Sequence, residues 1–145
     1  MGKKTILVDE TKILGSTEIV SFPGFQAIGE IEAKIDTGAY TGALHCTEIH
    51  LADDEDGKEE LRFSPFDHPE IEMKTDDFTT GADAESSNGE EQERFFINTR
   101  INIGGRTLPI TLTLANRAEM TRDVLIGRRF LAEYGFLVDV SKGGQ

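Results

Sequence analysis

The amino-acid sequence predicts an all-β domain with one short helix near its C-terminus. Short runs in which apolar and polar residues alternate recur along the chain, and a period of two is typical of half-buried strands. A helical pattern is convincing only over residues 128–134, where Phe130 and Tyr134 lie one turn apart. The 145 residues are enough for a single domain that folds without a disulfide or a metal.

The clearest strand covers residues 31–35 and leads directly into Asp36. It places Ile31, Ala33 and Ile35 on one face and two charged residues on the other. Further strands are expected over residues 18–22, 60–64 and 71–75, and a strand or a strand pair over 43–51, with a turn at 53–57.

The second half of the chain begins with a loop and continues with a hairpin. Residues 79–93 are rich in Gly, Ser, Asn and Glu without an apolar period, so we expect a mobile loop there. Residues 95–103 and 107–114 alternate around Gly104-Gly105, which is a hairpin signal. The remaining elements are an apolar strand over 124–126 that ends at Gly127, the helix over 128–134 with Gly135 at its C-cap, and a last strand over 136–140.

These elements are expected to form one domain over residues 1–145, with acidic flexible segments near 52–60 and 79–93. The formal net charge of −12 disfavours binding to nucleic acid or to anionic membranes. Cys46 is the one cysteine, which excludes an intrachain disulfide and fits a reducing compartment. The N-terminal residues match neither a signal peptide nor a membrane span, so we expect a cytoplasmic protein.

Asp36-Thr37-Gly38 is the most informative motif in the chain. An aspartate at a strand end, followed by threonine and glycine, suits a tight turn that presents the carboxylate in one direction. An ordinary surface turn is the competing interpretation, because Asp and Gly are common turn residues. The tripeptide therefore needs support from elsewhere in the sequence.

Together with a second motif near the C-terminus, this tripeptide resembles the retropepsin-like aspartic proteases. In those proteins the Asp-Thr-Gly loop is followed much later by two apolar residues and a glycine, matched here by Leu125-Ile126-Gly127. Residues 33–45 and 117–141 look like one bacterial and archaeal subfamily, often labelled "ATP-dependent zinc protease". The likeness extends from about residue 15 to residue 141 and is thin across the acidic segments.

The resemblance implies a closed acid-protease β-barrel and an aspartic endopeptidase. Such an enzyme needs two carboxylates that share one proton, but this chain has a single Asp-Thr-Gly. The resemblance therefore implies a homodimer in which Asp36 of each subunit is catalytic. The residues expected to support the active-site loop are Thr37, Gly38, Ala39, Leu125, Ile126 and Gly127.

A peptide or protein substrate would bind in an extended conformation, and retropepsins close a hairpin over it. Candidates for that hairpin are the turn around Asp67-His68-Pro69 and the loop at 79–93. Some relatives are associated with ATP-grasp ligases that add glutamates to ribosomal proteins, so the resemblance also suggests such a ligase as a partner. A non-catalytic module that binds peptides or partners in such a system is the alternative.

The subfamily label raises a third interpretation, a zinc peptidase. The sequence contains neither a Gly-x-x-x-x-Gly-Lys-[Ser/Thr] loop for ATP nor a His-Glu-x-x-His zinc motif. The remaining histidines and the cysteine are His45, Cys46, His50 and His68. If residues 43–51 form one straight strand, then Cys46, Glu48 and His50 share a face and are the metal candidates. Our expectation is that the protein uses no metal and no cofactor.

Overall fold

The computed structural model describes residues 9–83, 92–116 and 122–143. Most of them lie in strands, and α1 (Arg128–Glu133) is the one α-helix within these ranges. Two single 3₁₀ turns, η1 (Glu10–Lys12) and η2 (Gln26–Ile28), complete the helical elements of the described part. The strands are β1 (Ile13–Leu14), β2 (Thr17–Val20), β3 (Ile31–Asp36), β4 (Gly42–Asp53), β5 (Glu59–Pro65), β6 (Met73–Thr75), β7 (Phe78–Asp83), β8 (Gln92–Ile103), β9 (Arg106–Ala115), β10 (Val124–Gly127) and β11 (Leu137–Val138).

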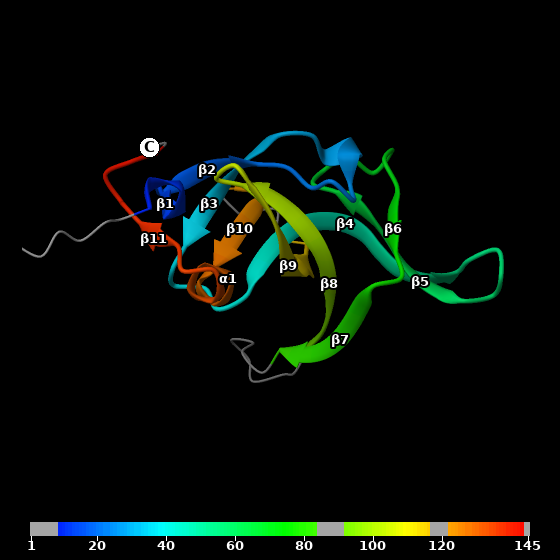
Figure 1. Cartoon of the computed structure of the whole chain (residues 1–145). Coiled ribbons are helices and arrows are strands. Elements are labelled where there is room, and N and C mark those ends of the chain that lie inside the picture. Colours follow the sequence, from blue (N-terminus) through cyan, green and yellow to red (C-terminus); the bar gives the residue numbers. More distant parts are fainter. Residues whose placement is uncertain (1–8, 84–91, 117–121, 144–145) are drawn as a thin grey trace, which may run out of the picture.

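The described strands form one large sheet and one small one (Figure 1). The nine-stranded sheet follows the order β2-β3-β10-β4-β9-β8-β7, and β5 and β6 branch from β4. β10 pairs in parallel with β3 and antiparallel with β4, so a late segment of the chain lies between two early ones. The small sheet pairs β1 in parallel with β11. The mostly β architecture with one short C-terminal helix confirms the predicted fold class at that level.

The closed barrel that the resemblance implied is not formed by the described strands. The path of paired strands begins at β2 and ends at β7, and a closed barrel needs a continuous ladder around its whole circumference. A single bridge joins Ser21, just after β2, to Asn102 of β8. Pro23 follows two residues later and has no N–H group to donate, which limits how far this ladder can continue.

The long strand β4 bends in its middle. Its first residues pair with β10 and β9, whereas its later residues pair with β5. The register with β5 shifts between Thr47 and His50, and Glu48 adopts a positive φ of 54°. Of the two predictions for residues 43–51, the single strand is the one observed, but it is not straight, because the irregularity rotates the side chains that follow it.

Two predicted segments differ from the structure. The loop predicted over 79–93 is wrong at its start, because residues 78–83 form β7 and pair with β8. Phe78 of β7 packs edge-to-face against Phe95 of β8, a cross-strand aromatic contact that the local composition did not reveal. Residues 84–91 lie outside the described ranges. The last strand is shorter than predicted, because Asp139 accepts hydrogen bonds from the backbone and hydroxyl of Ser141 and turns the chain.

The hydrophobic core lies under the strands that carry the predicted active-site motifs. Ala33, Leu44, Leu112 and Ile126 come from β3, β4, β9 and β10, and all four have 0% exposure. Because these strands are hydrogen-bonded neighbours, the buried side chains lock their relative positions. The ends of β3 and β10 therefore form a rigid support. No helix in the described ranges is long and apolar enough to cross a lipid bilayer.

Candidate active site

Asp36 is the last residue of β3 and lies on the edge of this support. β3 runs parallel to β10, and the register places Asp36 opposite Gly127. Its neighbour Ile35 is buried and lies opposite Ile126. The side of Asp36 away from the core is accessible, since the residue is only half-buried. A strand end that is anchored in the core thus carries a carboxylate at the surface.

The Asp-Thr-Gly loop is closed by its own hydrogen bonds. The Gly38 N–H donates to Asp36 Oδ1 over 3.0 Å, and the Ala39 N–H donates to the Asp36 carbonyl over 3.2 Å. A Cβ on Gly38 would lie 3.3 Å from Asp36 Oδ1, so glycine allows the tight return of the chain. Thr37 at the tip is exposed. This loop has the compact geometry that the motif predicted.

The strand β10 crosses behind the loop with almost no space between the two backbones. A Cβ built on Gly127 would lie 2.5 Å from the Tyr40 carbonyl oxygen and 2.8 Å from the Gly42 nitrogen. A Cβ on Gly42 would lie 2.5 Å from the Leu125 carbonyl oxygen. Only residues without a side chain fit at such a crossing. Gly127 therefore lies directly against the backbone that follows the loop, and Leu125 is half-buried beside it.

The start of α1 holds the loop from the other side. The Arg128 guanidinium donates from Nη1 to the Gly38 carbonyl over 3.1 Å, and its backbone N–H donates to the Ala39 carbonyl over 2.8 Å. The same guanidinium lies over the ring of Tyr40, 5.4 Å from the ring centroid, in a cation–π contact. The next residue, Arg129, donates its backbone N–H to the Tyr40 carbonyl over 3.0 Å.

Sequence reasoning missed the positioning roles of Tyr40 and Arg128. The Arg128 guanidinium donates to a backbone carbonyl of the loop. Two features of the sequence could have indicated these roles. Arg128 comes directly after Gly127, next to the crossing point, and Tyr40 comes directly after the loop.

The three metal candidates on β4 are not brought together. Cys46 is fully buried in the core, and its thiol donates to the Leu44 carbonyl over 3.2 Å. Glu48 and His50 are exposed, and the His50 Nδ1 contacts the Glu48 carbonyl at 2.8 Å. The bend in β4 breaks the alternation that would have placed the three on one face. Burial raises the pKa of the Cys46 thiol far above its usual value, only weakly opposed by a backbone hydrogen bond from Ala115.

The other two histidines have neighbours of a different kind. His45 is buried, with Nδ1 at 3.2 Å from the Ala115 carbonyl and Nε2 at 3.1 Å from Asp67 Oδ1. The exposed His68 contacts Glu70 at 3.0 Å. In the part of the chain that the structure describes, no three His, Cys, Asp or Glu side chains are grouped as metal ligands would be. The contact with His45 also ties the turn around Asp67 to β4.

Comparison with known proteins gives a consistent pattern. A family model described as "Retropepsin-like aspartic endopeptidase RimB" (RimB-like) matches residues 13–143. A protein of Shewanella pealeana named "Probable alpha-L-glutamate ligase" is 31% identical over 140 residues, covering 92% of this chain. A Desulfotalea psychrophila protein of the same name is 32% identical over 128 residues, covering 84% of this chain. The matched regions make up 30% and 27% of those two relatives, so this chain spans less than a third of their length.

A solved structure supports the fold. The crystal structure of a Legionella pneumophila protein of unknown function (DUF785) superposes with a TM-score of 0.65 at 22% sequence identity. The alignment covers 90% of this chain and 94% of the Legionella chain. At this level of identity the likeness concerns the fold alone.

Proposed function

The chain belongs to the RimB-like family of retropepsin-like aspartic endopeptidases, and from this premise we propose that it hydrolyses peptide bonds with two Asp36 carboxylates, one from each of two subunits. The observation that carries the proposal is the placement of Asp36 at the end of a core-anchored strand, in a loop closed by Gly38 and held by Arg128. The sequence has one Asp-Thr-Gly, so the second carboxylate comes from a second chain. A two-fold axis brings the same residue of both chains together.

The proposed chemistry follows from two carboxylates held close together. They cannot both ionise readily, so one is a carboxylate and the other a carboxylic acid. The ionised group takes a proton from water while the water oxygen attacks the carbonyl carbon of the scissile bond. The protonated group donates to the carbonyl oxygen. Collapse of the tetrahedral intermediate breaks the C–N bond, and the leaving nitrogen takes up a proton from the pair.

The rest of the loop has supporting roles in this proposal. Thr37 is exposed at the loop tip and would reach across the two-fold axis. Gly38 leaves room for the backbone of an extended substrate. Leu125, Ile126 and Gly127 hold the loop from behind through the pairing of β3 with β10, and the Ala39 carbonyl accepts the backbone N–H of Arg128. We place all of these residues and both motifs in a single domain.

A functional link to glutamate ligation is part of the proposal. The matched relatives are named as probable α-L-glutamate ligases, and this chain corresponds to about a third or less of each. A ligase forms an amide bond with glutamate, and a peptidase breaks amide bonds. We therefore propose that the chain acts together with such a ligase and that its peptide substrates include glutamate-containing ones.

Neither alternative function, the non-catalytic binding module or the zinc peptidase, needs Asp36 as a catalytic carboxylate. A non-catalytic module that binds a ligase or a peptide has no use for the carboxylate itself. A zinc peptidase needs a ligand set, and Cys46 lies in the core, separated from the exposed Glu48 and His50. The half-buried, solvent-accessible Asp36 favours the carboxylate mechanism over both.

The test compares wild type, Asp36→Asn and the matched control Asp76→Asn, an exposed aspartate in the turn between β6 and β7. Each protein is incubated with a peptide library enriched in glutamate, and products are identified by mass spectrometry. Sedimentation of the same samples gives the oligomeric state. We expect a dimer whose cleavage is lost in Asp36→Asn and retained in Asp76→Asn, with dimerisation unchanged.

Two results would decide for the alternatives. Cleavage that survives in Asp36→Asn and disappears with a chelator would replace the carboxylate mechanism by a metal-dependent one. A folded protein that cleaves nothing, with or without the ligase present, would favour the binding module.

A further inference from the structure

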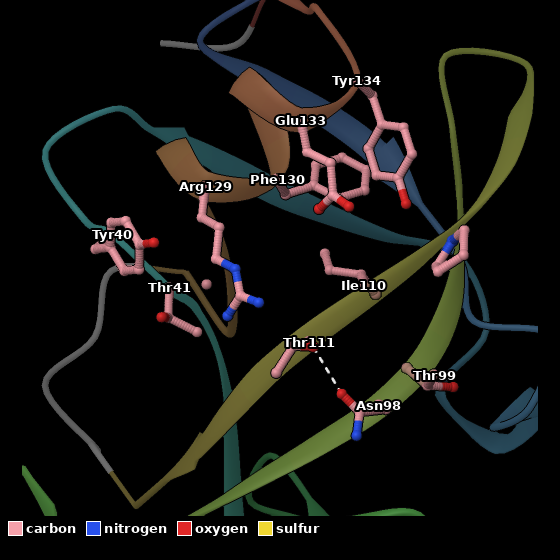
Figure 2. Close-up of a pocket in the computed structure, with 12 residues that line it drawn as sticks. Tyr40, Thr41, Asn98, Thr99, Ile110, Thr111, Arg129, Phe130, Glu133 and Tyr134 are labelled. Carbon is pink, nitrogen blue, oxygen red and sulfur yellow. Dashed lines mark hydrogen bonds between the residues drawn. The ribbon is translucent and has the colours of Figure 1, made fainter.

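A pocket of about 170 Å³ lies between α1 and the β8–β9 hairpin, beside the residues that follow the active-site loop (Figure 2). Its lining includes Tyr40 and Thr41 from the chain after the loop, Arg129 and Glu133 from α1, and Thr111 from β9, but not Asp36. One buried water needs about 10–15 Å³ of such space, and pockets that bind drug-sized ligands measure roughly 300–1,000 Å³. The pocket therefore suits a small molecule of a few non-hydrogen atoms.

Two opposite charges enter this pocket without pairing with each other. Figure 2 shows the side chains of Arg129 and Glu133 reaching from α1 into the space above β9. They lie one helical turn apart, a spacing that allows an ion pair. No salt bridge or side-chain hydrogen bond engages either of them among the described residues. A ligand can therefore reach both the guanidinium and the carboxylate.

Helix stability does not explain the two charges. An arginine one turn N-terminal to a glutamate is the weaker order for an ion pair on a helix. It also places the cation near the positive end of the helix and the anion near the negative end, which is the unfavourable arrangement. Arg128 in the same turn is compensated by its hydrogen bond to Gly38, but Arg129 has no such compensation in the described structure.

On the β8–β9 side of the pocket, the side chains of Thr111 and Asn98 already have hydrogen-bond partners. The Thr111 hydroxyl donates to Asn98 Oδ1 over 2.7 Å, and the Asn98 amide nitrogen donates to Asp77 over 3.0 Å. Ile110 of β9 and Phe130 of α1 add buried apolar side chains to the lining. Arg129 and Glu133 are both exposed and are the two charged residues in the lining of this pocket, which places one cation and one anion over an apolar surface.

We propose that this pocket binds a free α-amino acid in its zwitterionic form. The ligand carboxylate pairs with Arg129, its ammonium group pairs with Glu133, and its side chain lies on Ile110 and Phe130. A simple anion would be repelled by Glu133 and a simple cation by Arg129, whereas a zwitterion satisfies both. The proposal goes beyond peptide hydrolysis, since the site is separate from Asp36. It contacts the active-site loop only through Tyr40 and its neighbour.

The test is a calorimetric titration of the full chain with L-alanine, L-leucine and L-glutamate. Two derivatives of each probe serve as controls: the amide removes the carboxylate, and the N-acetyl compound removes the ammonium group. We expect at least one free amino acid to bind and both of its derivatives to bind at least about tenfold more weakly, because each loses one charged hydrogen bond. Repeating the titration with Asp36→Asn makes the result independent of peptide hydrolysis.

Variants assign the binding to the two side chains. Arg129→Gln and Glu133→Gln should each weaken binding at least about tenfold, and the exchange Arg129→Glu with Glu133→Arg should restore part of it by keeping both charges in the pocket. Lys74→Gln, an exposed charge on β6, is the matched control and should bind like wild type. No binding of any probe at millimolar concentration, equal binding of the derivatives, or unchanged affinity in both Gln variants would overturn the proposal.

Discussion

Gly127 is the residue at which the active-site loop and the crossing strand come closest. Its Cα lies against the backbone of Tyr40 and Gly42, with no room for a methyl group. The obstacles are main-chain atoms, which cannot rotate away as a side chain can. The position of the Asp36 carboxylate therefore depends on a residue that has no side chain.

We expect Gly127→Ala to lower the free energy of unfolding by about 1–3 kcal/mol, because the new methyl group must push the two backbones apart. Denaturant unfolding measures this loss. Gly24→Ala is the matched control, since its nearest atom is the Thr99 hydroxyl at 3.2 Å, which belongs to a side chain that can move. Equal stability of the two variants would show that the crossing relaxes easily.

Cys46 contributes a pH dependence to stability. Its buried thiol has a raised pKa in the folded state, whereas the unfolded thiol ionises near the usual value of 9.0. Below that pH the contribution of this thiol to stability is fully present. Above it, unfolding releases a proton from the thiol, so the free energy of unfolding falls as the pH rises. From about pH 9 to about pH 10.5 we expect a loss of about 2 kcal/mol that is absent in Cys46→Ala.

Denaturant titrations of both proteins across this range measure the difference. Thiol alkylation offers an independent check, because the native thiol should react slowly and the unfolded thiol quickly. Parallel alkaline curves for wild type and Cys46→Ala would contradict the assignment to this thiol.

At the residue scale, the sequence predicted the Asp36-Thr37-Gly38 loop but not the contacts of Tyr40 and Arg128 with it. Asp36, Gly38 and Gly127 were identified because they belong to two short motifs that resemble those of a known family. Tyr40 and Arg128 were not, because an aromatic ring or a guanidinium is acceptable at most surface positions. Their roles depend on long-range proximity, which a single sequence does not contain.

At the element scale, β4 joins two parts of the structure. Its first half is paired between β10 and β9, and its second half leaves them to pair with β5. The partner changes after His45, and the register with β5 then shifts where Glu48 adopts a positive φ, a conformation that is strained for a residue with a side chain. This bend separates Cys46 from the exposed residues that follow it.

Replacing Glu48 by glycine should relieve that strain. We expect Glu48→Gly to leave stability unchanged or to raise it by up to about 1 kcal/mol, because glycine adopts positive φ without penalty. Glu59→Gly is the matched control, an exposed glutamate in β5 whose replacement should be destabilising by a similar amount. Thermal unfolding of both variants checks the sign. A clear loss of stability in Glu48→Gly would indicate that its side chain, not its backbone, matters.

The elements that the sequence predicted best have a strong local period. The strand ending at Asp36 and the hairpin around Gly104-Gly105 follow from alternation and turn residues alone. β7 was missed because it is defined by its pairing with β8 and by the contact of Phe78 with Phe95, rather than by its own composition. The two-residue β1 and β11 are too short to produce a period, and each exists because the other is adjacent.

At the scale of the whole molecule, charge opposes the proposed dimer. Each chain has a formal net charge of −12, so two chains that approach each other repel at low ionic strength. Added salt screens this repulsion, with a Debye length of about 10 Å at 0.1 M. The net charge was available from the sequence, whereas the open path of the sheet was not, because it depends on where the ladder between β2 and β8 ends.

We expect the dissociation constant of the dimer to fall severalfold when the salt concentration rises from low to physiological values. Sedimentation equilibrium of the full chain measures it. A variant in which Asp54, Glu55 and Asp56 of the β4–β5 turn are replaced by their amides should respond less, because it removes three negative charges per chain. A dimer that weakens with salt would instead indicate attractive ion pairs at its interface.

The parallel seam between β1 and β11 has a mechanical consequence. Ile13 lies beside Leu137, and backbone hydrogen bonds from Asp139 to Leu14 and from Ser16 to Lys142 extend the contact. Because the strands point the same way, a pull applied before β1 and after β11 loads these bonds lengthwise and all at once, instead of opening them one by one like a zipper. The hydrogen bonds between β1 and β11 should therefore bear the tension first. The force would reach β3, the strand that carries Asp36, only after these bonds have broken.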